Sequence, residues 1–181
     1  MLLLALAPAV LSSAAGAPAA RPPLGLGRAP TPAEIAAWDI DVRADGRGLP
    51  PGRGDVAQGA EIYARKCQAC HGAGGEGGLA DPLVGGQGTL ASHHPVRTVG
   101  SYWPYATTLF DYVRRAMPLD APQSLSADEV YALTAYVLSR NGVVPAGAVM
   151  DARSLPKVRM PNRDGFITAD PRPDTGPPAR R

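Results

Sequence analysis

Three stretches between residues 56 and 142 repeat apolar side chains every three or four positions, the spacing of a helix that buries one face. The first begins after Asp55, a favourable N-cap, and its apolar face continues up to Cys67. That face consists of Val56, Gly59, Ile62, Tyr63 and Lys66. We expect a helix there, followed by a glycine-rich loop from Gly72 to Gly88.

The second stretch predicts a helix from Thr107 or Thr108 through Ala116. It should end at Met117, because a residue that precedes proline is biased away from helical geometry. Its apolar side consists of Leu109, Phe110, Tyr112 and Val113.

The third stretch has the most complete helix signals. Ser126 and Glu129 form a capping box at its start, and Asn141-Gly142 provides a stop at its end. Between them one face consists of Val130, Leu133, Thr134 and Val137. All three helices lie in one patterned stretch, roughly Val56 to Gly142, which we treat as one domain.

The flanks of this domain show no sustained period. Residues 21–54 are rich in proline and glycine and predict an extended N-terminal strap. Residues 143–181 predict an extended, basic, proline-rich C-terminal tail. Neither flank is expected to form an independent domain.

One part of the strap carries local helix signals. The segment from Thr31 to Trp38 predicts a short helix capped by Thr31, with Glu34 three residues after the cap. Beyond it, Ile40 and Val42 alternate with two aspartates, as in a short strand or an extended segment.

The first twenty residues, MLLLALAPAVLSSAAGAPAA, join a short apolar run to small residues, as a secretory signal does. Cleavage after Ala17, Ala19 or Ala20 fits this pattern. The run is short for a membrane span, and no other stretch resembles one, so we expect no stable span after cleavage. No lysine or arginine precedes the run, which leaves a mis-assigned start codon or an uncleaved anchor as alternatives. We expect export to the periplasm.

Composition and charge narrow the classes of function. The formal net charge is +2, and the basic excess lies in the tail: residues 143–181 have 7 basic and 4 acidic side chains, against 6 and 7 in residues 56–142. No basic stripe or aromatic platform accompanies this excess, so nucleic acid is not expected as a partner. The patterned region is small for an unaided hydrophobic core and would benefit from a metal, a disulfide or a large cofactor.

Both cysteines of the chain lie in one motif, CQACH, at residues 67–71. A structural zinc site needs four ligands, and only three gather here. An iron–sulfur cluster normally needs four thiolates, and a thioredoxin-like pair expects a preceding strand. A simple disulfide would leave His71 without a task.

Covalent attachment of one haem c accounts for the whole motif. Cys67 and Cys70 would form thioethers with the haem vinyl groups, and His71 would bind the iron. The three-residue spacing brings both sulfurs to one side of a helical turn. A buried porphyrin would also supply the core that the short patterned region lacks, so we favour this interpretation.

A haem that transfers electrons needs a sixth iron ligand. Met117 is favoured, because it lies before a proline in a loop between two helices, and a thioether raises the reduction potential. Met160 in the tail is its main rival. His93 or His94, in a polar loop, would instead lower the potential.

The order of helix, CxxCH, middle helix, Met-Pro loop and capped last helix resembles class I cytochrome c over about residues 55–142. That resemblance implies an all-α domain at residues 55–142, with three to five helices around the haem and the first and last crossing at right angles. The residues with the spacing to form that crossing are Gly59 with Tyr63 and Leu133 with Tyr136.

The same resemblance assigns residues to the haem environment. The carbonyl of Pro82 would accept a hydrogen bond from His71, and Leu83 would pack on the porphyrin. Donors to the haem propionates are expected among Arg97, Tyr102, Trp103 and Tyr105.

Four longer strings carry a narrower resemblance: TPAEIAAWDIDV (31–42), TVGSYWPYATTLFDYVRRAMP (98–118), LSADEVYALTAYVLSRNGVV (125–144) and SLPKVRMPNRDGF (154–166). They are similar to the cytochrome subunit that pairs with a molybdenum-containing sulfur or sulfite dehydrogenase in bacterial thiosulfate oxidation. This family implies that electrons pass from a molybdenum cofactor on the partner, through the haem, to a soluble cytochrome c acceptor. Some members carry two haems on a longer chain, whereas the single CxxCH here allows one.

No poised nucleophile or carboxylate pair predicts catalysis by the chain itself. We therefore expect an electron-transfer subunit of an oxidoreductase complex, not an enzyme on its own. A free-standing periplasmic electron carrier, or a catalytic haem protein with an exchangeable sixth ligand, are the alternatives. The basic residues expected to dock a partner are Arg153, Lys157, Arg159 and Arg163.

Overall fold

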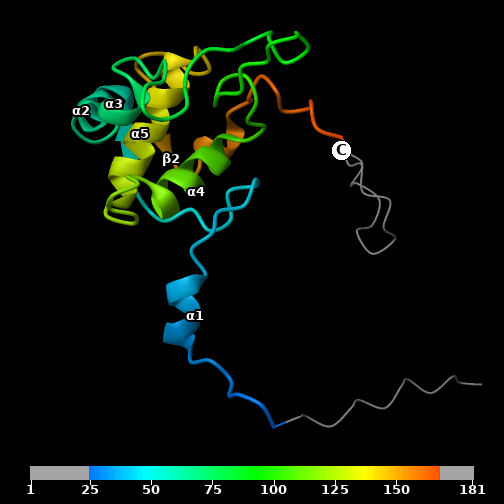
Figure 1. Cartoon of the computed structure of the whole chain (residues 1–181). Helices are drawn as coiled ribbons and strands as arrows, with labels where there is room; N and C mark the ends of the chain where they lie inside the picture. The colour runs from blue at the N-terminus through cyan, green and yellow to red at the C-terminus, as the bar shows by residue number, and fades with distance from the viewer. Residues whose placement is uncertain (1–24, 168–181) are drawn as a thin grey trace, which may run out of the picture.

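The computed structural model describes residues 25–167 and is mostly helical, which confirms the predicted all-α class (Figure 1). The helices are α1 (Pro32–Trp38), α2 (Val56–Lys66), α3 (Gln68–His71), α4 (Ala106–Ala116) and α5 (Ala127–Arg140). The remaining elements are β1 (Arg53–Asp55), β2 (Val149–Asp151) and the 3-10 turn η1 (Leu155–Lys157). The predicted signal segment, residues 1–20, lies outside the described residues.

The first and last helices of the domain pack directly on each other. Gly59 of α2 makes this possible, because a Cβ at that position would lie 2.0 Å from the carbonyl oxygen of Ala132 on α5. Beside this contact the rings of Tyr63 and Tyr136 lie with their centroids 5.0 Å apart. The predicted contact between these helices is confirmed.

The helix ends follow the capping chemistry predicted from the sequence. Thr31 and Ser126 each form a capping box, and Asn141 is the C-cap of α5. Asp55 caps α2 and forms a further capping box with Gln58. The α4 helix begins at Ala106, just before the predicted start, and ends before Met117 as expected.

The tail packs on the domain, and the prediction that it lies extended is wrong for residues 143–160. The docking role of its basic residues stays a prediction, and Arg153, Lys157 and Arg159 are exposed. β2 pairs antiparallel with β1, so that Met150 faces Gly54 across the ladder. Met150, Leu155 and Met160 are buried in the main core. The driving force is burial of apolar surface, which needs no helical or strand period.

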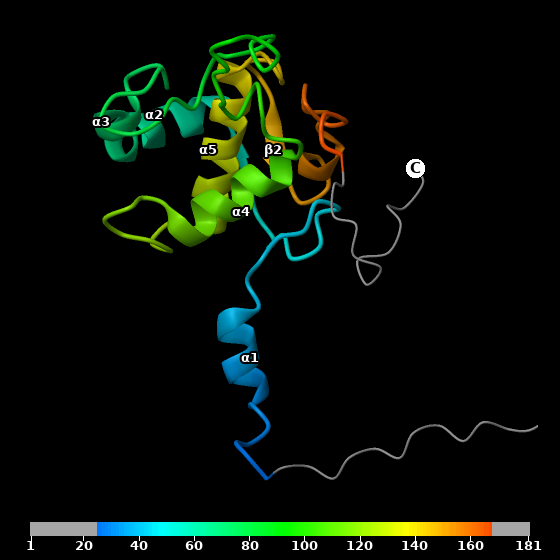
Figure 2. The ribbon, with the colours of Figure 1, turned by 45° about the vertical axis from the view of Figure 1, so that its right-hand side comes forward.

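The strap runs along α4 before the chain reaches α2. Residues 40 and 42 do not form a strand, but Val42 is buried against the main core. Beyond the strap, α1 projects away from the body of the molecule in both views (Figures 1 and 2). Within residues 25–167, no helix has the length and apolar character that crossing a membrane would require.

Candidate functional site

The CQACH motif follows α2 directly in the chain, and most of it forms a separate short helix, α3. Cys67 leaves helical geometry and ends α2, and α3 then carries the remaining four residues of the motif. Cys67 is half-buried and Cys70 is exposed, and both are free thiols, so they form no disulfide. In the described part of the chain, no three His, Cys, Asp or Glu side chains gather as a metal site. The motif therefore presents separate thiols and an imidazole.

The imidazole of His71 is held in one orientation. Its Nδ1 lies 2.8 Å from the carbonyl oxygen of Asp81, and since a carbonyl can only accept, Nδ1 donates. The other ring nitrogen, Nε2, is left with a lone pair for a metal. The prediction that Pro82 supplies this carbonyl is wrong by one residue, because the loop turns so that the Asp81 carbonyl faces the ring.

The loop after the motif is tied to it through the backbone. The Ala80 N–H donates to the Cys70 carbonyl at 2.9 Å, and the Gly77 N–H donates to the His71 carbonyl at 2.8 Å. From α2, the Tyr63 hydroxyl donates to the Gly72 carbonyl at 2.9 Å. Burial raises the pKa of Tyr63 to about 12, so this donor keeps its proton across the neutral range.

Asn141 fixes the continuation of the same loop. Its side-chain amide donates to the Leu83 carbonyl at 3.0 Å, and its side-chain oxygen accepts from the Gly85 N–H at 3.1 Å. The sequence indicated Asn141 only as the end of a helix. An amide at a C-cap carries a donor and an acceptor beyond the helix end, which is the signal that could have indicated this second role.

Met117 lies where its thioether can be presented to a ligand site. It is the extended C-cap of α4, with its N–H donating to the Val113 carbonyl at 3.1 Å, and it is half-buried. The alternative ligand Met160 is buried in the main core, with 1% of its surface exposed, and its side chain packs against other apolar residues. His93 and His94 are exposed. Of the two methionines, Met117 is the one that lies at a loop and is not buried in the main core.

The loop after α4 and the α3 helix lie on the same side of α5 in two views (Figures 1 and 2). On this side, α2 and α5 share a small core of Ile62, Tyr63, Ala132 and Leu133. The apolar residues packed against it are only partly covered, and they are Cys67, Leu83, Val113, Leu125 and Tyr136. A half-covered apolar wall between thiols, an oriented imidazole and a thioether fits a haem.

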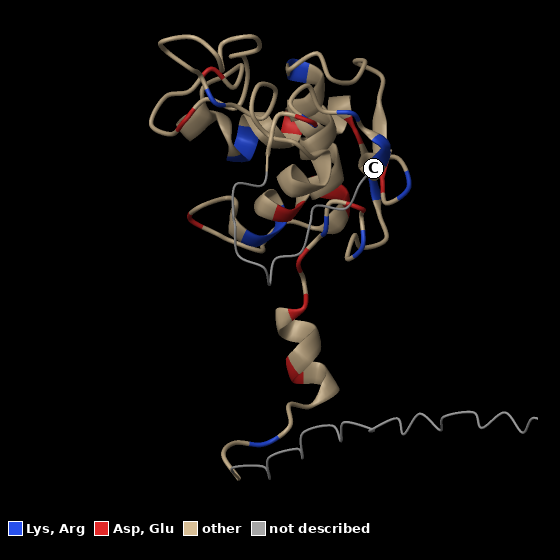
Figure 3. Cartoon of the chain, turned by 90° about the vertical axis from the view of Figure 1, so that its right-hand side faces the viewer, with Lys and Arg blue, Asp and Glu red and all other residues tan. Residues whose placement is uncertain are grey.

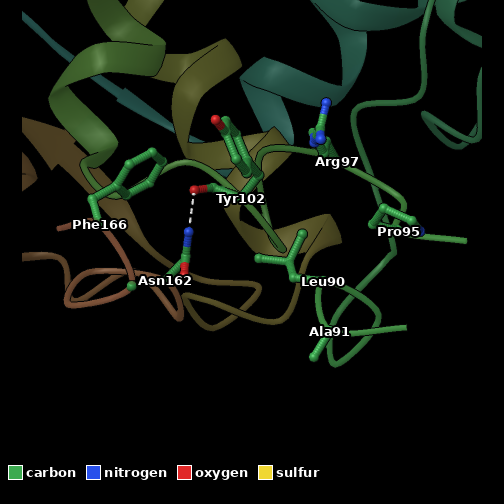
Figure 4. A pocket seen from close by; sticks show the side chains of 8 residues that line it. Leu90, Ala91, Pro95, Arg97, Tyr102, Asn162 and Phe166 are labelled. Carbon is green, nitrogen blue, oxygen red and sulfur yellow. Dashed lines mark hydrogen bonds between the residues drawn. The ribbon is translucent and has the colours of Figure 1, made fainter. Parts of the chain in front are cut away.

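Of the residues predicted near the haem propionates, Tyr102 contacts the tail, and Arg97 lies beside Tyr102. The guanidinium of Arg97 lies 5.7 Å from the centre of the Tyr102 ring. Asn162 donates to the Tyr102 carbonyl at 2.7 Å, and the Phe166 ring meets the Tyr102 ring edge-on (Figure 4). These four residues line an open pocket of about 340 Å³. The propionate role of Arg97 and Tyr102 stays a prediction.

The other two predicted residues lie along the start of α4. Trp103 packs edge-on against Tyr112 and touches the main core. Tyr105 forms a β-bridge with Arg159 of the tail, and the guanidinium of Arg163 stacks over its ring at 4.2 Å. The contacts of Trp103 and Tyr105 satisfy packing, and their role near a haem also stays a prediction.

Comparison with known proteins now places the chain. A family model described as cytochrome c oxidase, cbb3-type, subunit III matches residues 54–137. A chain in the crystal structure of the sulfane dehydrogenase SoxCD from Paracoccus pantotrophus is 46% identical, with a TM-score of 0.77. That match covers 86% of this chain and 77% of the other. This chain belongs to the cytochrome c family.

The match to SoxCD extends beyond residues 55–142 of this cytochrome, since 86% of the chain is more than those residues contain. The resemblance to sulfur dehydrogenase cytochromes is thereby confirmed. A curated relative, thiosulfate dehydrogenase from Stutzerimonas stutzeri (strain A1501), is 30% identical over 98 residues. The matched region is 50% of this cytochrome and 29% of that relative.

Proposed function

We propose that this cytochrome carries one haem c and passes single electrons from a molybdenum-containing sulfur-compound dehydrogenase subunit to a soluble cytochrome c in the periplasm. The substrate of that subunit would be sulfane sulfur or sulfite. The observation that supports this most is the oriented His71 in a single CxxCH motif, within a chain 46% identical to one in a sulfane dehydrogenase. The haem domain would comprise residues 55–142.

Each residue of the candidate site has a definite task in this proposal. Cys67 and Cys70 would hold the haem covalently, and His71 and Met117 would bind its iron. When bound, the haem supplies an iron that takes up and releases one electron. The chain itself carries out no bond-breaking step.

The protein controls the surroundings of that iron. The Asp81 carbonyl keeps the His71 ring from rotating, and a histidine ligand held in this way has a defined tautomer and basicity. Leu83 and Val113 offer apolar surface that keeps water from the site. A dry pocket and a thioether ligand both favour the reduced, less charged iron, which suits a high-potential electron relay.

Reduction of the haem-loaded chain by the partner tests this function. The visible absorption of the haem is followed after mixing with the molybdenum-containing subunit and sulfite, or a sulfane-sulfur substrate. We expect reduction only when subunit and substrate are both present, with each omitted in turn as control. If dithionite reduces the haem but the molybdenum-containing subunit with its substrate does not, the result would favour a free-standing electron carrier over a subunit of that complex. Carbon monoxide binding by the reduced native protein would instead indicate an open iron site.

A further inference from the structure

The α1 helix is fully formed but buries none of its residues. Trp38 is 88% exposed, Leu26 is 86% exposed and Ile35 is 49% exposed. An isolated helix of seven residues is marginal in water, because nucleation costs more than so few hydrogen bonds return. A helix of this length that presents apolar side chains is stabilised when another surface covers them.

Local chemistry pre-forms this helix. Thr31 and Glu34 make a reciprocal capping box, and both Glu34 carboxylate oxygens accept hydrogen bonds from Arg28. Such a box with a bidentate ion pair fixes the first turn. The helix is therefore already folded before it binds a partner, which lowers the entropy cost of binding.

The strap is bonded to α4 just after the end of α1. The Val42 N–H donates to Asp111 at 2.8 Å, and Arg114 donates to the Ile40 carbonyl at 3.1 Å. Farther along, the Thr107 hydroxyl donates to the Ala44 carbonyl at 3.3 Å. A partner that grips α1 would thereby be fixed relative to the helix that ends at Met117.

The apolar side chains of α1 share their face with carboxylates. Ile35 and Trp38 line one shallow hollow together with Asp39 and Asp41. Residues 25–42 contain three carboxylates and one guanidinium, and red positions dominate this part of the chain (Figure 3). A complementary surface would combine an apolar groove with basic side chains at its rim.

A second copy of the chain fits this face poorly. The exposed Trp38, Ile35 and Leu26 side chains offer roughly 450 Å² in all. A stable dimer buries about 800 Å² on each partner, which is more than this face offers. Two copies that met through it would also place the negative carboxylates of one copy against those of the other, and these would repel. The helix is therefore suited to be one anchor within a larger interface with a different protein.

We propose that α1 is the anchor by which the catalytic dehydrogenase subunit holds this cytochrome, an inference that rests on the proposed function. Trp38 and Ile35 insert into an apolar groove of that subunit, and basic residues at the groove rim face Asp39 and Asp41. The strap and its bonds to α4 then set the position of the haem domain on the partner.

The test measures binding of the haem-loaded full chain to the purified molybdenum-containing subunit. Trp38→Ala and Ile35→Ala remove the anchor but leave α1 a strong helix former, and neither residue is buried. Both should weaken binding by about tenfold or more, as expected for a buried aromatic or aliphatic anchor. Ala33→Gln, about 160° around the helix from Ile35, is the matched control and should leave the affinity unchanged.

Three outcomes separate the proposals. If the wild-type chain does not bind the subunit, the proposed function fails, and this inference fails with it. If the wild type binds and both anchor variants bind equally well, α1 is not the anchor although the proposed function stands. If the free chain is a dimer in light scattering and Trp38→Ala makes it a monomer, the occupant of α1 is a second copy.

Discussion

The Asp111 carboxylate of α4 accepts a hydrogen bond of 2.8 Å from the backbone N–H of Val42, 69 residues earlier in the chain. The same carboxylate forms an ion pair with Arg115 on the next turn of α4. Asp111 is 8% exposed, so these partners replace the hydrogen bonds to water that its carboxylate has lost. One side chain thus joins the strap to the helix that presents Met117.

Replacing Asp111 should release the strap without dismantling the haem domain. In Asp111→Ala the buried Val42 N–H loses its acceptor, and we expect unfolding free energy to fall by about 1–3 kcal/mol. Amide hydrogen exchange at Val42 should speed up more than exchange in α5. Asp120→Ala, at an exposed loop position, is the control and should change neither quantity. Equal exchange at Val42 in the wild type and Asp111→Ala would contradict this role.

Alanine variants of the two candidate methionine ligands should differ in their absorption spectrum and in their stability. Met117→Ala should abolish the weak near-infrared band of methionine bound to oxidised haem iron, because the ligand is removed. Met160→Ala should keep that band and lose about 2–5 kcal/mol of stability, since it leaves a cavity in the main core. Loss of the band in Met160→Ala alone, with Met117→Ala unchanged, would reverse the assignment.

Packing of α2 on α5 should not tolerate a side chain at Gly59. A Cβ there would lie 2.0 Å from the Ala132 carbonyl oxygen and 2.7 Å from the Tyr136 Cβ, so the helices must separate. We expect Gly59→Ala to cost about 1–3 kcal/mol in denaturant unfolding. Gly147→Ala is the matched control, because nothing lies within 4 Å of a Cβ at that position. A Gly59→Ala protein as stable as Gly147→Ala would refute the close approach.

The cap of α1 should respond to acid. Hydrogen bonds from Arg28, then from Thr31, lower the pKa of Glu34 from 4.5 to about 2. Because the pKa is depressed in the folded chain, these bonds contribute fully above about pH 4.5, and their contribution is lost as the pH falls through about 2. Carboxyl NMR of Glu34 should show this titration, and Arg28→Gln should move the pKa towards 4.5. A wild-type midpoint already at 4.5 would rule out the bidentate pair.

Residues with strong local signals were predictable from the sequence. Asp55, Ser126 and Thr31 are caps whose chemistry acts within three residues, and the structure has each of them in place. The contact of Gly59 with α5 was predictable because a helical face with a glycine allows close approach. These signals depend only on neighbouring residues or on one regular period.

Other features depend on contacts between distant parts of the chain. Burial of Met150 and Leu155 was missed because residues 143–160 have no period, although their apolar side chains fill the main core. The Asp81 carbonyl was missed because a resemblance assigns a loop only to within a residue. Asn141 was identified as a helix end, but its bonds to residues 83 and 85 arise only once the loop folds back.

The pairing of β1 with β2 also sets the order in which the molecule can be completed. Residues 53–55 find their partners only at 149–151, so everything between them, including CQACH, is synthesised before the ladder can close. Contacts this distant carry an entropy cost, because a long loop must be closed before they return any energy. The CQACH motif is therefore synthesised while the domain is still open along this seam, which only residues 149–151 can close.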